Sequence, residues 1–402
     1  MKFQSLDMYL FLSLSVCLLG TSMFARQKRQ LFLALNLVFI SLFFTQSRLP
    51  SMIILLLWCA SHYAVLQLML RVTWKRALFV LWLVADLAWF VLVKEYHWIT
   101  RGFLSGHSFF IWWSVLGYSF ILFRQIHLSV SVRDGVITAV KPLDYLNYNL
   151  AFWTFLAGPI QRYDDFVEQQ TLSVAQPVPA LDFLKGANRM VWGLIKMAAL
   201  APVVEKYAEV TVFTSLPNIA TFVLFLAAFP LYLYLNFSGY CDVMLGLGRM
   251  VGFRLPENFR MPFAARNMVD FWSRWHISLS EFFRDYLYFP MVTSASRRFN
   301  PLASMLAATL ISFLLMGIWH GNTIRFAVFG ALHGIGVIVT LLYGEFLKAV
   351  LSREQLKAYR QNSAVRVMAI IVCQLYVLAA FLVFQYSYSD LSRVLNVLKG
   401  HG

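Results

Sequence analysis

The stretch FWSRWHISLSEFFRDYLYFP occupies residues 271–290, and MGIWHG follows at residues 316–321. Each stretch places a histidine directly after a tryptophan, at His276 and at His320. The second histidine ends an apolar run, where an ionisable side chain indicates a functional site. Because imidazole gains and loses a proton near neutral pH, these two stretches predict proton-transfer chemistry inside a membrane protein.

The composition around these stretches is that of an integral membrane protein. Of the 402 residues, 60% are hydrophobic and 13% charged, and the mean hydropathy is +0.66. Soluble domains carry about 25% charged residues, and a membrane-spanning helix needs about 20 apolar ones. We therefore expect an all-α polytopic membrane protein with about ten or eleven crossings. The predicted spans are 8–24, 31–46, 52–70, 77–94, 103–123, 188–205, 217–236, 302–319, 326–347 and 366–388, with a shorter apolar segment at 146–160.

The formal charge of +15 reflects membrane topology and lipid contact rather than nucleic-acid binding. Lys and Arg residues gather in short clusters between the apolar runs, as the positive-inside rule requires. The clusters after the first and third predicted spans are richer than the turn between the second and third, which holds only Arg48. This pattern places the N-terminus outside. The richer clusters are Arg26, Lys28 and Arg29, and Arg71, Lys75 and Arg76.

The middle of the chain departs from this simple pattern. Residues 246–300 are too polar for a plain span and too aromatic for an ordinary loop, so we expect re-entrant or interfacial helices that form a bowl within the spans. In NFSGYCD, Gly239 predicts a broken helix. We expect one membrane domain over residues 1–402, with N-terminal spans at 1–123, a catalytic core at 124–345 and a C-terminal span and tail at 346–402.

His320 is the first candidate catalytic residue. A neutral imidazole there would accept a proton from an alcohol as a general base. Trp319 would wall the site against water, and Gly321 would let a substrate or backbone approach closely. The alternative is a histidine at a helix end, hydrogen-bonded to a carbonyl at the interface.

His276 is the second candidate. A continuous helix through residues 271–288 would place His276, Ser280 and Arg284 on one stripe, because they are four residues apart. Such a stripe would bind anionic substrate groups, or it would be the polar side of an interfacial helix. The residues alone leave both interpretations open.

Further polar and aromatic residues are candidates for substrate binding, each with a structural alternative. Asp285 would pair with Arg284 or Arg274, or orient a histidine, and the ion pair is preferred. Arg162, in GPIQRYDDF, would meet a phosphate or carboxylate, or extend to the membrane interface. His333 would line the same cavity as His320 or simply pack, and packing is preferred. The remaining candidates are Arg274, Trp275 and, in NFSGYCD, Asn236 and Ser238. The NFSGYCD patch would line a tunnel or close a helix contact.

Several familiar catalytic motifs are absent from the sequence. It has no Walker-type glycine loop, HExxH, GxSxG or metal-spaced Cys/His cluster, so nucleotide hydrolysis, zinc proteolysis and serine-hydrolase chemistry lose support. The four cysteines form no CxxC pair and are expected to be small buried hydrophobes. We therefore expect no bound metal and no tightly bound cofactor.

Five ordered motifs between Gly158 and His333 resemble the bacterial branch of the membrane-bound O-acyltransferase (MBOAT) family: AGPIQRYDDF, FSGYCD, PENFRMPF, FWSRWHISLSEFFRDYLYFP and MGIWHG. This branch contains D-alanyl-teichoic-acid transferases and alginate O-acetylases. The resemblance implies a ring of spans around a thin central region, and it implies that His320 is the catalytic histidine and His276 the second functional one.

The resemblance also implies an activity and its partners. An acyl thioester, on the phosphopantetheine of an acyl carrier protein or as acetyl-CoA, would arrive from the cytoplasm. The acyl group would pass to hydroxyls of an extracytoplasmic glycopolymer, with a helper acyltransferase or esterase-like protein on that side. The location would be the bacterial cytoplasmic membrane. The alternatives are a transporter or flippase without covalent chemistry, and a scaffold that docks a carrier protein on the loops near 124–145 and 290–300. For the scaffold, charge reversal at Arg297 and Arg298 would abolish function.

Overall fold

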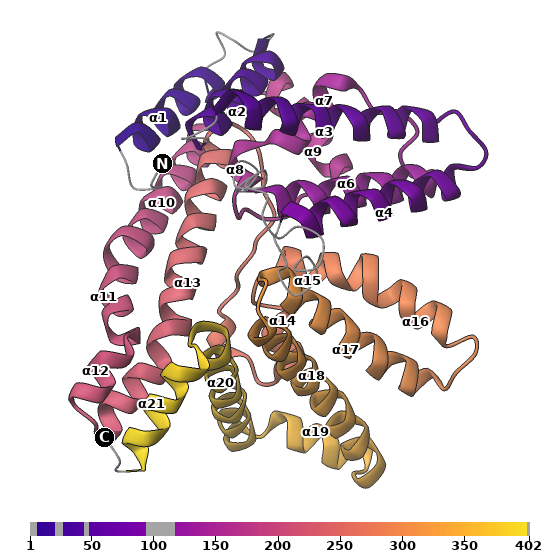
Figure 1. Cartoon of the computed structure of the whole chain (residues 1–402). Coiled ribbons are helices and arrows are strands. Elements are labelled where there is room, and N and C mark those ends of the chain that lie inside the picture. The colour runs from indigo at the N-terminus through magenta and orange to yellow at the C-terminus, as the bar shows by residue number, and fades with distance from the viewer. Residues whose placement is uncertain (1–5, 21–26, 44–47, 94–116, 400–402) are drawn as a thin grey trace, which may run out of the picture. The chain divides into compact units, whose positions relative to one another are not determined.

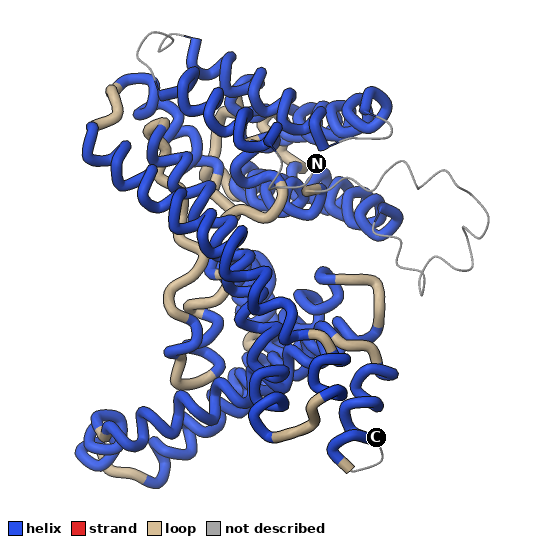
Figure 2. The backbone as a smooth tube through the Cα atoms, turned by 90° about the vertical axis from the view of Figure 1, so that its left-hand side faces the viewer, coloured by secondary structure: helices blue, strands red, loops and turns tan. Residues whose placement is uncertain are grey.

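A computed structural model of the chain describes residues 6–20, 27–43, 48–93 and 117–399. Within these ranges the backbone forms helices and connecting loops without a strand; two residues, Phe259 and Trp275, make an isolated antiparallel bridge (Figure 2). The prediction of an all-α protein is confirmed.

Five of the described helices are long and apolar enough to cross a membrane. An apolar helix suits the bilayer because it satisfies its backbone hydrogen bonds internally. The five match five predicted spans to within a few residues at most ends, and they indicate a multi-pass membrane protein. They are Leu49–Met69, Ile219–Met250, Pro301–His320, Ile324–Val350 and Ser363–Gln385.

The chain divides into two compact units. The first unit comprises Met1–Ile195 and Gly239–Pro256, and the second comprises Lys196–Ser238 and Glu257–Gly402. The helices of the first unit are α1 (Leu6–Gly20), α2 (Lys28–Phe43), α3 (Arg48–Met69), α4 (Lys75–Val93), α6 (Tyr118–Arg133), α7 (Pro142–Leu150), α8 (Phe152–Phe155), α9 (Tyr163–Ala175), α10 (Ala180–Leu194) and the end of α13 (Ile219–Met250) (Figure 1).

A buried arginine organises the interior of the first unit. Arg124 on α6 is 1% exposed and donates to the carbonyl oxygens of Tyr148, at 3.0 Å, and Asn149, at 2.6 Å, and to both oxygens of Thr154. These acceptors end α7 and line α8, so the guanidinium caps backbone groups that the two short helices leave unpaired. The apolar segment at 146–160 is therefore a pair of short helices.

The helices α10 and α13 approach one another through glycines. A Cβ atom on Gly193 would lie 2.6 Å from the carbonyl oxygen of Gly239, and one on Gly186 would lie 2.7 Å from that of Gly246. Small residues let helix backbones pack this closely. The predicted break at Gly239 is wrong, because α13 runs unbroken through it. Gly239 serves a close helix contact instead.

Two other sequence predictions need correction. The predicted span 188–205 consists of the end of α10, the π-helix η3 (Ile195–Leu200) and the short α11 (Ala201–Glu205). The predicted span 103–123 ends too early, since α6 continues to Arg133. Residues 103–116 of that span lie outside the described ranges.

Lys28 also differs from its predicted place in a charged loop. It is the first residue of α2 and is buried, and its ammonium group donates to the carbonyl oxygens of Ser173, at 2.7 Å, and Val251, at 2.9 Å. Lys28 therefore ties three segments of the first unit together. The charge bias from which an outside N-terminus was predicted then depends more on Arg71, Lys75 and Arg76.

The second unit contains the long helices α17 (Pro301–His320), α18 (Ile324–Val350) and α20 (Ser363–Gln385), and the start of α13. Its shorter elements are η4 (Lys206–Ala208), α12 (Val210–Ser215), η5 (Pro262–Ala264), α14 (Met268–Trp272), α15 (Ile277–Phe283), η6 (Arg284–Tyr288), α16 (Phe289–Ala295), α19 (Arg353–Gln361) and α21 (Tyr388–Leu398). The helices α17 and α18 run side by side, and α20 lies against α18 (Figure 1).

The short C-terminal helix α21 packs into a buried apolar cluster of the second unit. Phe213 on α12, Phe225 on α13, Tyr386 and Val394 form a buried apolar cluster. The hydroxyl of Tyr386 donates to the carbonyl oxygen of Ala208 at 2.5 Å. The predicted C-terminal span and tail therefore pack onto the segment that leads into α13.

Candidate active site

His320 is the last residue of α17, and its position follows from the two ends of that helix. The side chain of Asn300 caps the start by accepting hydrogen bonds from the N–H groups of Leu302 and Ala303. At the other end, Gly321 adopts extended backbone and stops the helix. His320 is half-buried, so its imidazole is not sealed within the packed interior.

Aromatic rings surround the imidazole of His320. Ring centroids lie 4.7 Å away for Trp319, 5.4 Å for Phe384 and 6.1 Å for Phe329. The ring of Trp319 lies beside the imidazole, and its role in walling the site against water stays a prediction. Apolar walls of this kind limit water and strengthen electrostatic interactions at the imidazole.

Close packing of α17 against α18 fixes where His320 lies. A Cβ atom on Gly317 would be 2.2 Å from the carbonyl oxygen of Phe326 and 2.9 Å from the Cα of Gly330. A Cβ on Gly321 would lie 2.1 Å from the Phe326 ring. The missing side chain of Gly321 therefore makes room for Phe326, and its predicted contact with substrate stays a prediction.

His276 lies at a break between two helices, and the predicted continuous helix through 271–288 is wrong. Helix α14 ends at Trp272, α15 begins at Ile277, and η6 continues from Arg284 as a π-helix. His276 has φ 45° and ψ 53°, in the left-handed region that a bulky residue seldom adopts. Backbone strain of this kind clusters at functional sites, which makes His276 a stronger candidate than its sequence position suggested.

Asn258 holds the backbone around His276, and the sequence reasoning missed it. Its side-chain oxygen accepts from the N–H of Ser278, at 3.1 Å, and from the Ser278 hydroxyl, at 3.0 Å, while its carbonyl accepts from the N–H of Ile277. Asn258 is 1% exposed. The only sequence signal was an asparagine inside PENFRMPF, among apolar and aromatic residues.

The imidazole of His276 is buried, at 4% exposure, and its ring lies 4.8 Å from that of Phe237 in an edge-to-face arrangement. Its Nδ1 has no hydrogen-bond partner. Burial, together with the smaller effect of the neighbouring His320, lowers the pKa of His276 to about 3. His276 is therefore neutral at pH 7, with one N–H available as a donor.

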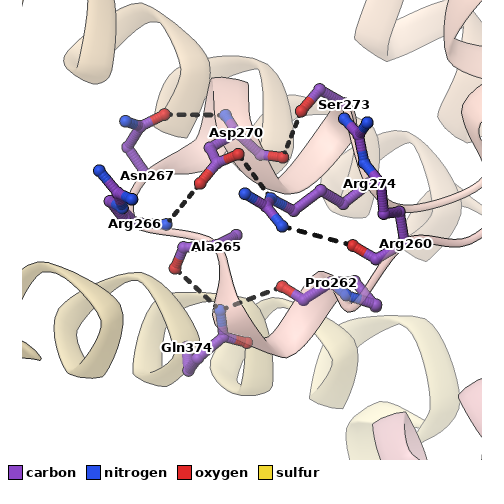
Figure 3. A network of polar contacts seen from close by, with 9 residues as sticks. All are labelled: Arg260, Pro262, Ala265, Arg266, Asn267, Asp270, Ser273, Arg274 and Gln374. Carbon is purple, nitrogen blue, oxygen red and sulfur yellow. Dashed lines mark hydrogen bonds and ion pairs between the residues drawn. The ribbon is translucent and has the colours of Figure 1, made fainter.

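Arg274 belongs to a polar network at the start of this region (Figure 3). Its Nε donates to Asp270 at 2.6 Å, and Asp270 also accepts from the backbone N–H of Arg266. These partners hold the pKa of the Asp270 carboxyl below its ordinary value, although burial opposes them. Gln374 on α20 donates to the carbonyl oxygen of Ala265, which anchors the same loop. The structure thus gives Arg274 a local partner within the loop.

The other predicted residues of this stretch have local contacts. The expected ion pair of Asp285 with Arg284 is confirmed, at 2.8 Å. The Ser280 hydroxyl donates to the carbonyl oxygen of His276 at 3.2 Å and so closes the first turn of α15. Trp275 is buried and stacks on Phe271, with centroids 5.7 Å apart. Ser280 and Trp275 therefore brace the backbone at His276.

Asn236 and Ser238 lie on α13, in the second unit. The Asn236 amide donates to the Tyr232 hydroxyl at 3.3 Å. The Ser238 hydroxyl is buried without a hydrogen-bond partner. Arg162 belongs to the first unit, where it is exposed and precedes α9 as its N-cap residue. A role in substrate binding stays a prediction for all three.

An open surface hollow of about 460 Å³ lies at the end of this region and is lined by Asp285, Phe289, Pro290, Thr293, Ser294 and Arg297. It brings the predicted Asp285 together with Arg297. In the part of the chain that the structure describes, no group of three or more His, Cys, Asp or Glu side chains could hold a metal ion. Of the four cysteines, Cys17 is exposed and the other three are buried.

The chain is similar in sequence to a known family and to several known proteins. The profile of the MBOAT, membrane-bound O-acyltransferase family, matches residues 30–383. A probable alginate O-acetylase of Pseudomonas putida is 33% identical over 231 residues, which are 57% of this chain and 46% of that protein. A teichoic acid D-alanyltransferase of Bacillus subtilis is 30% identical over 227 residues, 55% of this chain and 58% of that protein.

A third relative is a peptidoglycan O-acetyltransferase of Helicobacter pylori, 32% identical over 203 residues, which are 50% of this chain and 38% of that protein. The chain spans about half the length of the relatives it matches. The three names describe O-acetylation of alginate, transfer of D-alanyl to teichoic acid and transfer of O-acetyl to peptidoglycan.

Proposed function

Since this chain belongs to the membrane-bound O-acyltransferase family, we propose that it passes an acyl group, D-alanyl or acetyl, from a cytoplasmic thioester to hydroxyls of a cell-envelope or extracellular glycopolymer. The observation that carries this proposal is the pair of histidines in the second unit. One, His320, is partly accessible at the end of a membrane helix, and the other, His276, is buried, neutral and strained.

His320 acts as the general base in this proposal. Its imidazole takes the proton of the acceptor hydroxyl while that oxygen attacks the thioester carbonyl carbon. The carbon–sulfur bond then breaks, an ester remains on the acceptor, and the departing thiolate receives the proton that His320 held. The aromatic walls formed by Trp319, Phe329 and Phe384 keep competing water away from the thioester.

His276 supports the same reaction without changing its own charge. Because it is neutral at pH 7, its ring N–H can donate a hydrogen bond to the oxygen that becomes negative during attack. The strained backbone and the Asn258 contacts hold the ring in place before substrate binds. This preorganisation suits a group that stabilises developing charge.

The donor, the acceptor and the membrane setting complete the proposal. The donor is an acyl carrier protein or acetyl-CoA on the cytoplasmic face, and a helper acyltransferase or esterase-like protein assists on the acceptor side. The protein lies in the bacterial cytoplasmic membrane with its N-terminus outside. The names of the relatives, which act on alginate, teichoic acid and peptidoglycan, support this choice of acceptors.

The test is a transfer assay with the purified protein in liposomes. Labelled acetyl-CoA or D-alanyl carrier protein is supplied on one side and a polyol-containing polymer on the other, and the ester formed is counted. His320→Gln should lower the rate by about 10²- to 10⁴-fold, since a general base contributes about that much. Lys357→Gln, an exposed change on α19, should leave the rate unchanged.

Two results would contradict the proposal. One is a folded His320→Gln protein, with the wild-type melting temperature, that still makes ester at the wild-type rate. The other is a wild-type protein that moves labelled donor across the membrane and forms no ester, which is the behaviour of a transporter or flippase.

A further inference from the structure

His333 lies on α18 within an aromatic cage. Its side chain is 0% exposed. Ring centroids lie 4.4 Å away for Phe329, 5.2 Å for Trp272, 5.9 Å for Phe381 and 6.2 Å for Phe271. Helices α14, α18 and α20 all contribute to this cage.

Neither nitrogen of the His333 ring has a hydrogen-bond partner. A neutral imidazole carries one donor and one acceptor, and burying either without a partner opposes folding. A phenylalanine would fill an aromatic cage of this kind without that cost. Packing, which the sequence favoured for His333, therefore does not explain why a polar ring occupies this place.

His333 is linked to His320 through the cage. Both imidazoles contact the ring of Phe329, at 4.4 Å for His333 and 6.1 Å for His320. A positive charge on His320 opposes the protonation of both His333 and His276, so these two imidazoles stay neutral beside a charged His320. His320 is thus the shared neighbour of two buried imidazoles, and it is the one with access to the surroundings.

We propose that His333 is a positioning residue of the acyl-transfer site, which acts through His320: its buried ring dipole stabilises the charge that His320 acquires when it takes the acceptor proton. The inference rests on the proposed function. The cage excludes water from the His333 ring, so a fixed dipole there acts more strongly than it would in solvent. His333 itself does not touch the reacting atoms and gains no proton.

The experiment compares His333→Phe with His333→Gln in the liposome assay. His333→Phe removes both unpaired nitrogens and keeps an aromatic ring, so the melting temperature should equal or exceed that of the wild type. Its kcat should nevertheless fall by at least about 10-fold, with the KM for the acyl donor unchanged. His333→Gln restores a polar group, and its kcat should lie between those of the wild type and His333→Phe.

A double substitution tests whether His333 acts through His320. If it does, His333→Phe should cause no further loss of rate in a protein that already carries His320→Gln. A fully active His333→Phe protein would overturn the inference, as would independent, multiplying losses in the double variant. If neither His333 variant folds, the role of His333 is purely structural, and that result also overturns the inference.

The outcomes separate this inference from the proposed function. A wild-type protein that forms no ester contradicts the proposed function itself. A wild-type protein that forms ester, together with a His333→Phe protein that forms it equally fast, contradicts only the role assigned to His333.

Discussion

Replacing Gly317 by alanine should disturb the close packing of α17 against α18. The added Cβ would lie 2.2 Å from the carbonyl oxygen of Phe326 and 2.9 Å from the Cα of Gly330. Carbon–oxygen contacts of this kind are normally about 3.3 Å or longer, so α17 and α18 would have to separate locally by about 1 Å. His320 follows three residues later on the same helix.

Two opposing terms set the size of the effect on stability. Overpacking costs about 1–3 kcal/mol, and replacing a helical glycine by alanine returns about 1 kcal/mol, so the net loss is up to about 2 kcal/mol. A shift of about 1 Å at a catalytic group can lower a rate by about 10²-fold. The measurements are thermal unfolding of the purified protein in detergent and the rate of acyl transfer.

Gly344→Ala is the matched control, because it lies on α18 and its Cβ would meet no atom within 4 Å. It should keep full activity and gain up to about 1 kcal/mol from helix propensity. If Gly317→Ala and Gly344→Ala unfold at the same temperature and transfer acyl groups equally fast, the proposed packing control of His320 is wrong.

Three further predictions concern the loop around His276. The pKa of His276 is about 3 in the folded protein and about 6.5 in the unfolded chain. The unfolded chain therefore binds the proton first as the pH falls from 6.5 towards 3, and the free energy of unfolding is lowered by about 2 kcal/mol at pH 5. His276→Asn, which tolerates the left-handed backbone, should remove that part of the pH dependence of the melting temperature. Asn258→Ala should cost about 1–3 kcal/mol, measured by thermal unfolding, since it leaves the buried N–H of Ser278 unpaired. Asp270→Asn should cost no more than about 1 kcal/mol by the same measurement, because its pair with Arg274 is partly exposed.

The membrane helices of the second unit were predictable from the sequence. The spans expected at 302–319, 326–347 and 366–388 correspond to α17, α18 and α20, since an apolar run of that length has few alternatives to a helix. The neighbourhood of His320 was partly predictable too, because Trp319 and the helix end are adjacent in sequence. The contact with Phe384 was not, because that residue is far along the chain.

The region around His276 could not be predicted because tertiary contacts override the local pattern there. Helical spacing favoured one helix through 271–288, but Asn258 holds the backbone of Ser278 and breaks it. Likewise, Gly239 in NFSGYCD predicted a helix break, but in the structure Gly193 of α10 packs closely against it. In both cases the deciding partner lies 20 or more residues away along the chain, where periodicity carries no information.

The bonds between Asn258 and residues 277–278, and between the backbones of Arg260 and Arg274, join two sequence segments into one structural piece. Chimeras that aim to exchange acyl or acceptor preference with a relative should therefore transplant residues 257–283 as a whole. A graft of the segment that contains His276 alone would separate this segment from the one that contains Asn258. The His276 imidazole would then lose its orientation, although every proposed catalytic side chain was retained.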